Sequence, residues 1–234
     1  MLACSSTLKP ILRQLDPNIR LITEWKNAGP FDAWCPLTGL PRLAGTTLET
    51  IPTDVPYLPA APERVVRWTE QLDRLTPSGL KRIGVVWAGR PAHKNNWKRS
   101  MTLPALAPVA ALDGIALVVL QKGPEQRQTG KYYGRAPLIH LSAEVENFED
   151  TMAIMAGLDL VLTVDTPVAH LAGGMGRPVW IMVPWCAEWR WLQDRTDSPW
   201  YPTARLFRQP APNDWQGTAE QVAEALSTVR VQAV

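Results

Sequence analysis

The chain has 234 residues, of which 46% are hydrophobic and 20% charged, a balance typical of a folded globular protein. Its formal net charge of +2 argues against nucleic acid as a main partner. No apolar stretch reaches the roughly 20 residues that a transmembrane helix requires, and the N-terminus lacks the pattern of a secretory signal. Three scattered cysteines without a CxxC pair complete the prediction of a reduced, cytoplasmic protein.

The first 77 residues differ in pattern from the rest of the chain. Proline and glycine recur through residues 30–63 without a long helical period, so we expect connecting loops there. A helix is expected at residues 64–75, and residues 76–79 are typical of a linker. This part is too short to form a second domain of the kind predicted next.

From residue 78 onward, apolar segments alternate with helical ones. In chain order we expect a strand at 83–87, a helix at 103–112, strands at 116–121 and 138–141, a helix at 148–156, a strand at 158–164, a helix at 168–173, strands at 179–183 and 205–208, and a helix at 218–229. Strands separated by helices indicate a parallel sheet. The prediction is an α/β protein with a Rossmann-like domain at residues 78–234.

Tryptophan is unusually frequent, with 11 residues, and is concentrated between Trp180 and Trp215. This segment is expected to form a packed aromatic cap or an interface. Within it we expect Cys186 to be buried rather than nucleophilic. Residues 194–202 are expected to be a structured loop without a functional role.

The most informative pattern lies at residues 158–183. An apolar run ends at Asp165 and Thr166, a short helical segment carries His170, and glycines lead into a second apolar run. In parallel sheets ligands collect beyond the carboxyl ends of the strands, where helix N-termini offer N–H groups to anions. These three residues therefore indicate a diphosphate site, with the hydroxyl and the imidazole as donors. The alternative is that Asp165 or Thr166 only caps the helix and His170 is a packed surface residue.

A second candidate is the polar loop at residues 89–100, which follows the first strand of the predicted domain. Gly89 permits close approach of a ligand, and Arg90, Lys94, Lys98 and Arg99 supply positive charge. The alternative is a solvated loop in which Ser100 caps the next helix.

A third candidate is Gln121 with Lys122, at the end of the second strand and on the same sheet edge. The position favours a ligand contact, although such a pair is also common in an ordinary turn.

Several other kinds of site are not supported. The three histidines have no metal-ligand spacing, so no metal site is predicted, and no cofactor is expected. The chain lacks GxGxxG, GxxxxGK[ST] and GxSxG motifs, which argues against a dinucleotide fingerprint, a P-loop and a hydrolase elbow.

Several separated motifs resemble a known family. They are VVWAGRPAHKNNWKRS, LVVLQKG, NFEDTMAIMAGLDLVLTVDTPVAHLAGGMGRPVWIMVP, EWRWLQDRTDSPWYPTARLFRQ and Asp214-Trp215. In this order they are similar to the C-terminal part of bacterial glycosyltransferase-like proteins that often carry tetratricopeptide repeats. These proteins are related to the ADP-heptose:lipopolysaccharide heptosyltransferases. The resemblance covers essentially all of residues 81–234.

The resemblance implies a GT-B fold, in which the C-terminal Rossmann-like domain binds a nucleotide-diphosphate sugar without a catalytic metal. By resemblance, Asp165, Thr166 and His170 hold the donor diphosphate, and Lys94 pairs with phosphate or sugar. The implied reaction is transfer of a sugar to a glycan or protein acceptor.

The chain departs from this family at its N-terminal end. Heptosyltransferase-like proteins carry an early Gly-Asp motif that contributes the catalytic base, and residues 1–77 contain none. We therefore expect residues 1–77 to be an incomplete remnant of the acceptor-side domain with its linker, and we assign no catalytic base. The alternative function is a non-catalytic nucleotide-sugar-binding or interaction module. A homo-oligomer or an N-terminal partner domain is the expected assembly.

Overall fold

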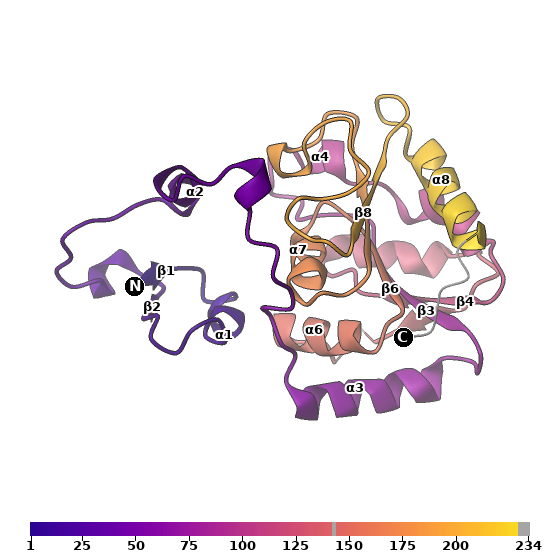
Figure 1. Ribbon diagram of the computed structural model, residues 1–234. Helices are drawn as coiled ribbons and strands as arrows, with labels where there is room; N and C mark the ends of the chain where they lie inside the picture. Colours follow the sequence, from indigo (N-terminus) through magenta and orange to yellow (C-terminus); the bar gives the residue numbers. More distant parts are fainter. Residues whose placement is uncertain (142–143, 229–234) are drawn as a thin grey trace.

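The computed structural model describes residues 1–141 and 144–228, and its centre is a six-stranded parallel sheet (Figure 1). The order of the strands in the sheet is β5-β4-β3-β6-β7-β8. The strands are β3 (Lys81–Val86), β4 (Ile115–Val119), β5 (Leu138–His140), β6 (Leu160–Val164), β7 (Val179–Val183) and β8 (Ala204–Arg208). This arrangement confirms the predicted α/β class and the parallel sheet.

Helices cover both faces of the sheet (Figure 1). One face carries α3 (Pro62–Leu75), α6 (Phe148–Ala156) and α7 (Pro167–Gly174), and the other carries α5 (Ala107–Ala110) and α8 (Trp215–Thr228). Successive residues of a strand point to opposite faces. In β4, Ala116 and Val118 accordingly join the core under α6, whereas Leu117 and Val119 join the core under α5 and α8. Burial on both faces explains why the strands are nearly continuous apolar runs.

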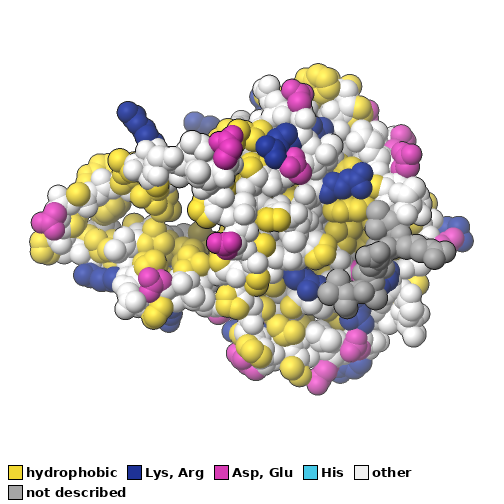
Figure 2. Space-filling model, in the orientation of Figure 1, with side chains coloured by type: hydrophobic (Ala, Val, Ile, Leu, Met, Phe, Trp, Pro, Cys, Tyr) yellow, Lys and Arg dark blue, Asp and Glu magenta, His cyan; other side chains and the backbone are white. Residues whose placement is uncertain are grey.

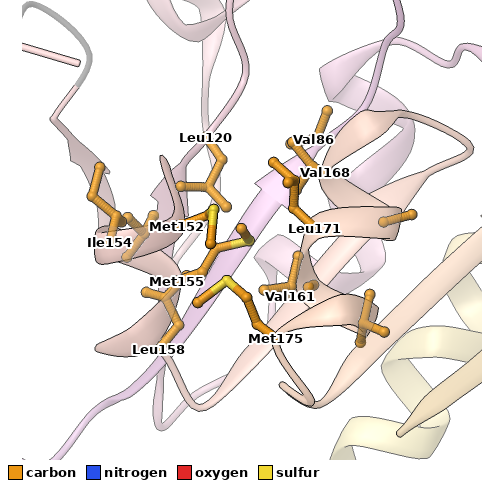
Figure 3. Packing of buried hydrophobic residues seen from close by; sticks show 14 of the residues in the cluster. Val86, Leu120, Met152, Ile154, Met155, Leu158, Val161, Val168, Leu171 and Met175 are labelled. Atoms are coloured by element: carbon orange, nitrogen blue, oxygen red, sulfur yellow. The ribbon is translucent and has the colours of Figure 1, made fainter. Parts of the chain in front are cut away.

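The core beneath α6 and α7 is rich in methionine. Figure 3 shows Met152 and Met155 of α6 gathered with Met175, at the end of α7, around Val161 of the sheet. Flexible thioether side chains fill such irregular spaces between two helices and a strand well. This packing fixes the C-terminal end of α7 against α6 and the sheet.

Helix α3 precedes the predicted domain boundary at residues 77/78 but is packed with the sheet domain. Its Trp68 and Leu72 side chains are fully buried, and α3 lies along α6. The carboxylate of Asp150, on α6, accepts hydrogen bonds from Arg64 Nη1 at 2.6 Å and from Trp68 Nε1 at 3.2 Å. The contact between the two helices is therefore both apolar and ionic.

The segment before α3 consists of short elements that extend away from the sheet (Figure 1). They are β1 (Leu2–Ala3), α1 (Lys9–Leu12), β2 (Leu21–Ile22), η1 (Trp25–Asn27), η2 (Leu37–Gly39), α2 (Leu40–Leu43) and η3 (Leu48–Thr50), where η marks a 3-10 helix. Strands β1 and β2 pair in parallel as a separate small sheet. Residues 30–61, where connecting loops are expected, contain only the short η2, α2 and η3, and the rest of that stretch is loop, as predicted.

Large apolar side chains are exposed along this N-terminal segment, and Figure 2 shows them as yellow groups over the part that projects from the sheet domain. They include Trp25, Phe31, Trp34, Leu37, Leu40, Leu43 and Leu48. Three remaining short elements lie in the sheet domain: α4 (Asn96–Arg99), η5 (Pro124–Lys131) and η6 (Trp189–Trp191).

The prediction of one continuous α-helix at 103–112 is wrong. The structure has a 3-10 turn, η4 (Leu103–Leu106), followed by the single turn of α5. Pro108 has no N–H group to donate to the carbonyl of Pro104, and Ala107 N–H bonds that carbonyl instead. The predicted final helix begins earlier than expected, at Trp215, and Val229 lies outside the described residues.

Within the described ranges, none of the helices has the length and apolarity that crossing a bilayer requires.

Candidate functional site

The candidate site lies where the sheet changes its direction of growth. From β3 the chain adds β4 and β5 on one side, then returns to β6 beside β3 and adds β7 and β8 on the other side. The loops after β3 and β6 therefore diverge and leave a crevice at the carboxyl ends of the strands. A cavity of about 690 Å³ lies there, lined by the loop after β3, the turn after β6 and the segment after β7. This volume is in the usual range for a small-molecule site.

The turn after β6 carries the first candidate residues. Thr166 is the N-cap of α7, but its side chain makes no capping hydrogen bond. Its hydroxyl lies 3.0 Å from that of Thr163, and Thr163 donates its own proton to the Val164 carbonyl. Because each hydroxyl has one proton, Thr166 must be the donor to Thr163. In this arrangement the Thr166 hydroxyl is engaged by Thr163, and its role as a donor to a diphosphate stays a prediction.

The backbone at the start of α7 still favours anions. Pro167, at the first helical position, has no N–H group, so Val168 is the first residue of the helix with one to offer. The helix dipole places partial positive charge at this end. This positive end lies at the cavity, because Thr166 and Pro167 both line it.

Asp165 is buried and paired with a cation from the loop after β3. Its carboxylate lies 3.9 Å from Arg99 Nη1, and both side chains are less than one-fifth exposed. Arg99 Nε is buried and has no hydrogen-bond partner among the described residues. The guanidinium is therefore held in place by one long ion pair, with capacity left for an anion.

Gly89 makes room for this arrangement. A side chain at Gly89 would come within 2.7 Å of Asn96 Oδ1 and 3.0 Å of Arg99 Nη2. The Gly89 N–H donates to Ser100 Oγ at 3.0 Å. The side chains that approach Gly89 closely are therefore Asn96 and Arg99 of the same loop, rather than a ligand. The absence of a side chain at Gly89 lets Arg99 lie against the end of β3.

His170 is held on two sides by aromatic residues. Its ring stacks on Trp191, with centroids 5.3 Å apart and an interplanar angle of 13°, and Nδ1 lies 2.9 Å from the Tyr201 hydroxyl. Nε2 is the nitrogen left for the cavity, since His170 lines it.

The protonation of His170 follows from its surroundings. Burial lowers the pKa of its imidazole below the ordinary value. The neighbouring Asp165 and Glu188 raise this pKa, and Arg190 and Arg99 lower it, so the net shift is downward. The imidazole is therefore neutral near pH 7.

The segment after β7 forms the remaining wall. Arg190 pairs with Glu188 at 2.5 Å and lies over the ring of Trp189. Cys186 lines the cavity and is exposed, so the expectation that it is buried is wrong. The loop it occupies runs over the sheet edge and leaves the thiol accessible at the cavity.

The other predicted site residues lie elsewhere. Arg90 and Lys94 are exposed on the loop after β3, and the side chains from that loop that line the cavity are instead His93, Asn95, Lys98 and Arg99. Sequence spacing does not distinguish these cations, because the direction of each depends on how the loop folds back through α4.

Gln121 and Lys122 also have partners within the protein. The Gln121 amide accepts from the N–H groups of Trp87 and Ala88, and it donates to the carbonyls of Ala88 and Lys122. Lys122 Nζ donates to the Val145 carbonyl at 2.5 Å. Gln121 thus ties the end of β4 to the end of β3 and supports the cavity from behind.

Residues missed by the sequence analysis come from the aromatic segment. Tyr201, in the stretch expected to be a loop without function, is buried and bonded to His170. Trp191 is fully buried against the same ring, as the predicted aromatic packing requires. The concentration of tryptophan at 185–200 is the available signal, but it does not indicate which strand end the segment covers.

The described part of the chain contains no group of three His, Cys, Asp or Glu side chains that could hold a metal ion.

The fold and the position of the cavity define a class: the sheet domain has the fold of the GT-B glycosyltransferases. It is similar to a family 9 glycosyltransferase from Veillonella parvula, with a TM-score of 0.53 and 15% identity over 73% of this chain and 52% of the other. It is also similar to the E. coli ADP-heptose lipopolysaccharide heptosyltransferase II, with a TM-score of 0.52 and 16% identity over 76% of this chain and 55% of the other.

Among curated proteins, the chain is 26% identical over 208 residues to protein FlbA of Caulobacter vibrioides. The match covers 86% of this chain and 34% of FlbA. No protein-family model matches. The chain thus spans about a third of FlbA and about half of each of the two solved structures.

Proposed function

We propose that the chain is a metal-independent glycosyltransferase whose cavity binds the diphosphate of a nucleotide-sugar donor. The observation that carries this proposal is the meeting, at the switch point of the sheet, of the α7 N-terminus with Lys98 and Arg99. The E. coli heptosyltransferase of similar fold is named for an ADP-sugar, which supports a donor of this class. The acceptor is a glycan or a protein.

The chemistry needs positive charge at one place. Transfer of the sugar breaks the bond to the diphosphate, and negative charge develops on the departing oxygen. Fixed dipoles and cations aimed at that oxygen stabilise the transition state, and in this role they take the place of a metal ion. Lys98, Arg99 and the Val168 N–H group at the start of α7 are the candidates in this chain.

The three predicted diphosphate residues take distinct parts in this proposal. Asp165 carries only acceptors, so it acts by holding Arg99 rather than by contacting phosphate. Thr166 shapes the turn through the hydrogen bond between its hydroxyl and that of Thr163. His170 presents Nε2 to the ligand. Arg90 and Lys94 stay predictions as donor contacts.

Residues 1–77 are proposed as the acceptor-side part of the molecule. The support is the contact between this segment and α7, the helix whose N-terminal end lies at the cavity: at its C-terminal end, the Gly174 carbonyl accepts from Tyr57 N–H at 2.9 Å. A catalytic base is not part of the proposal.

Titration with ADP, UDP and GDP by calorimetry tests the donor site. We expect one of the three to bind, and Lys98→Ala to weaken that binding about tenfold, since a charge-assisted hydrogen bond to phosphate contributes roughly 1.5–3 kcal/mol. Lys131→Ala is the matched control, because Lys131 lies on η5 outside the cavity. Lys94→Ala tests whether Lys94, which is predicted to contact the donor but does not line the cavity, contributes to binding. Absence of binding by all three nucleotides would overturn the proposal.

The exposed thiol of Cys186 gives an independent test of location. A bound nucleotide in the cavity should slow alkylation of Cys186, measured by peptide mass spectrometry, while Cys4 and Cys35 react as before. If the nucleotide slowed the alkylation of none of the three cysteines, its binding site would lie elsewhere. A second assay uses the sugar derivative of the nucleotide that binds. Release of free sugar from it, or transfer of that sugar, separates the enzyme from a binding module.

A further inference from the structure

A second cavity at the carboxyl ends of the strands lies between α4, η5 and the start of α8, and we call it the α4–α8 pocket. Its volume of about 490 Å³ is within the range of small-molecule sites. None of the described residues that line it also lines the donor cavity. The single turn of α4 separates the two, because it presents Asn96 and Trp97 to the α4–α8 pocket. The same turn presents Lys98 and Arg99 to the donor cavity.

The charge of the α4–α8 pocket argues against a phosphate ligand. Its lining, among the described residues, contains the carboxylates Glu125 and Asp214 but no lysine, arginine or histidine. A phosphate group would meet negative charge there without a cation to pair with it. The donor cavity has the opposite character, since Lys98, Arg99 and Arg190 line it. The α4–α8 pocket therefore suits a ligand without negative charge.

Two side chains of the pocket carry N–H groups that the protein does not use. Asn96 Oδ1 accepts from Ser100 Oγ at 2.9 Å, and the Asn96 Nδ2 protons have no acceptor in the described part of the chain. Trp215 is only 8% exposed, and no described residue accepts a hydrogen bond from its Nε1. Because buried polar groups are normally hydrogen-bonded, these N–H groups favour a ligand that carries acceptors.

Carboxylate and amide oxygens of the pocket supply acceptors. Asp214 Oδ1 accepts from the Gly217 N–H at 2.8 Å, at the start of α8, and Oδ2 has no donor among the described residues. On η5, one carboxylate oxygen of Glu125 accepts from Gln128 Nε2, and the other is left for a ligand. The neighbouring Asn213 adds a side-chain amide without a hydrogen bond to the described chain. The pocket thus offers both donors and acceptors.

An indole ring adds flat apolar surface to these polar groups. Trp97 lines the pocket and is 67% exposed, and Lys98 Nζ lies over its ring at 5.2 Å from the centroid. A ligand that matches this combination is apolar on one side and carries groups at its edge that both donate and accept. A sugar ring has this form, because its faces carry C–H groups and its edge carries hydroxyls.

We propose that the α4–α8 pocket binds one ring of an uncharged glycan. Asn96 and Trp215 donate to its oxygens, Asp214 accepts from its hydroxyls, and Trp97 packs on a C–H face. Binding here does not depend on the proposed donor site. The consequence for the reaction does rest on the proposed function: the shared turn of α4 places a bound glycan beside the donor, so the glycan is favoured over the protein as acceptor.

The experiment follows the indole 1H–15N signals during titration of the nucleotide-free protein with the methyl glycosides of glucose, galactose, mannose and N-acetylglucosamine. The chain has 11 tryptophans, and Trp97→Ala, Trp215→Phe and Trp34→Ala assign three of the signals. We expect at least one glycoside to shift the signals of Trp97 and Trp215. The signal of Trp34, which is 68% exposed on the N-terminal segment, should stay unchanged.

Two substitutions test the contacts without disturbing the core. Trp97→Ala removes an exposed ring, and Asn213→Gly removes the amide while keeping the backbone at its positive φ of 65°. Each should raise the dissociation constant of the glycoside about fivefold, because each removes one of few contacts. The matched control is Trp34→Ala, which removes an equally exposed ring outside the pocket and should leave the constant unchanged.

Three results would overturn the inference. The first is that no glycoside shifts the Trp97 or Trp215 signal in the folded protein. The second is that spermidine shifts them and the glycosides do not, which would make the pocket a cation site. The third is that ADP, UDP or GDP displaces the bound glycoside, which would assign the pocket to the nucleotide. Failure of all three nucleotides to bind would overturn the donor site alone, because the glycosides are titrated without nucleotide.

Discussion

Single residues in α7 decide how its surface can be used. Gly173 and Gly174 place two tyrosine rings against the helix, and the imidazole of His170, one turn earlier, lies between Tyr201 and Trp191. The His170 ring is consequently fixed by stacking and by one hydrogen bond.

Gly173→Ala should destabilise the fold by about 2–3 kcal/mol, because the added methyl group would lie 2.3 Å from Tyr201 Cγ in a packed region. Urea denaturation measures the change. Gly130→Ala is the control, since no atom lies within 4 Å of the position its methyl group would take. Equal stabilities of the two variants would show that the helix surface accommodates the methyl group.

At the scale of elements, the contact between α3 and α6 contains a buried carboxylate. Asp150 is 3% exposed and accepts from Arg64, from Trp68 and from the Glu146 N–H group. Burial raises the pKa of Asp150, but these hydrogen bonds and the charge of Arg64 lower it more, so the net shift is downward. The residue is ionised near neutral pH.

Asp150→Asn should lower the free energy of unfolding by about 2 kcal/mol at pH 7, because Arg64 loses its charge-assisted hydrogen bond and keeps only the longer ion pair with Glu149. The folded pKa lies below the unfolded value of about 3.9, so the ionised group stabilises the fold above that value. This contribution is lost as the pH falls through the lowered folded pKa, and the difference between the variant and the parent should then shrink.

The control for this measurement is Glu144→Gln. Glu144 pairs with Arg67 on the same two-helix face, but both side chains are more than half exposed. We expect a change below about 1 kcal/mol, as for other surface ion pairs. A similar loss in both variants would contradict the importance given to the buried carboxylate.

At the scale of the whole molecule, the sheet domain is well packed, whereas the N-terminal segment presents apolar surface. Trp25, Trp34 and Leu43 are each more than 60% exposed on elements that project from the domain (Figure 2). Apolar surface of this kind commonly marks an interface.

We therefore expect the chain to self-associate. Sedimentation velocity at increasing protein concentration should show a rising mean mass, and Trp25→Ser with Trp34→Ser and Leu43→Ser should suppress that rise. The control is Tyr133→Ser, because Tyr133 is 93% exposed but lies in the sheet domain, just after η5. This substitution should leave the association intact. A constant monomer mass for the parent chain would contradict the expectation.

The order of elements from residue 81 onward follows from local patterns. Continuous apolar runs at β4, β6 and β7 indicate strands buried on both faces, and the apolar residues between them carry the helical period of α6. The failure at 103–112 is also local, because it depends on the missing N–H group of Pro108. The observed ends of the strands differ from the predicted ones by one or two residues, because pairing with the neighbouring strand, which decides where a strand ends, is not encoded locally.

The sequence by itself determined the class of fold, the sheet edge at which the cavity lies, and the turn at Asp165 that lines it. These are set by short-range periodicity and by the shared direction of parallel strands. Only the tertiary structure decided which side chains line the cavity. Arg99 rather than Lys94 reaches Asp165, Gln121 is used to join β3 and β4, and Tyr201 arrives from 31 residues beyond His170. Such contacts depend on loop paths and on packing between distant segments, which no local pattern encodes.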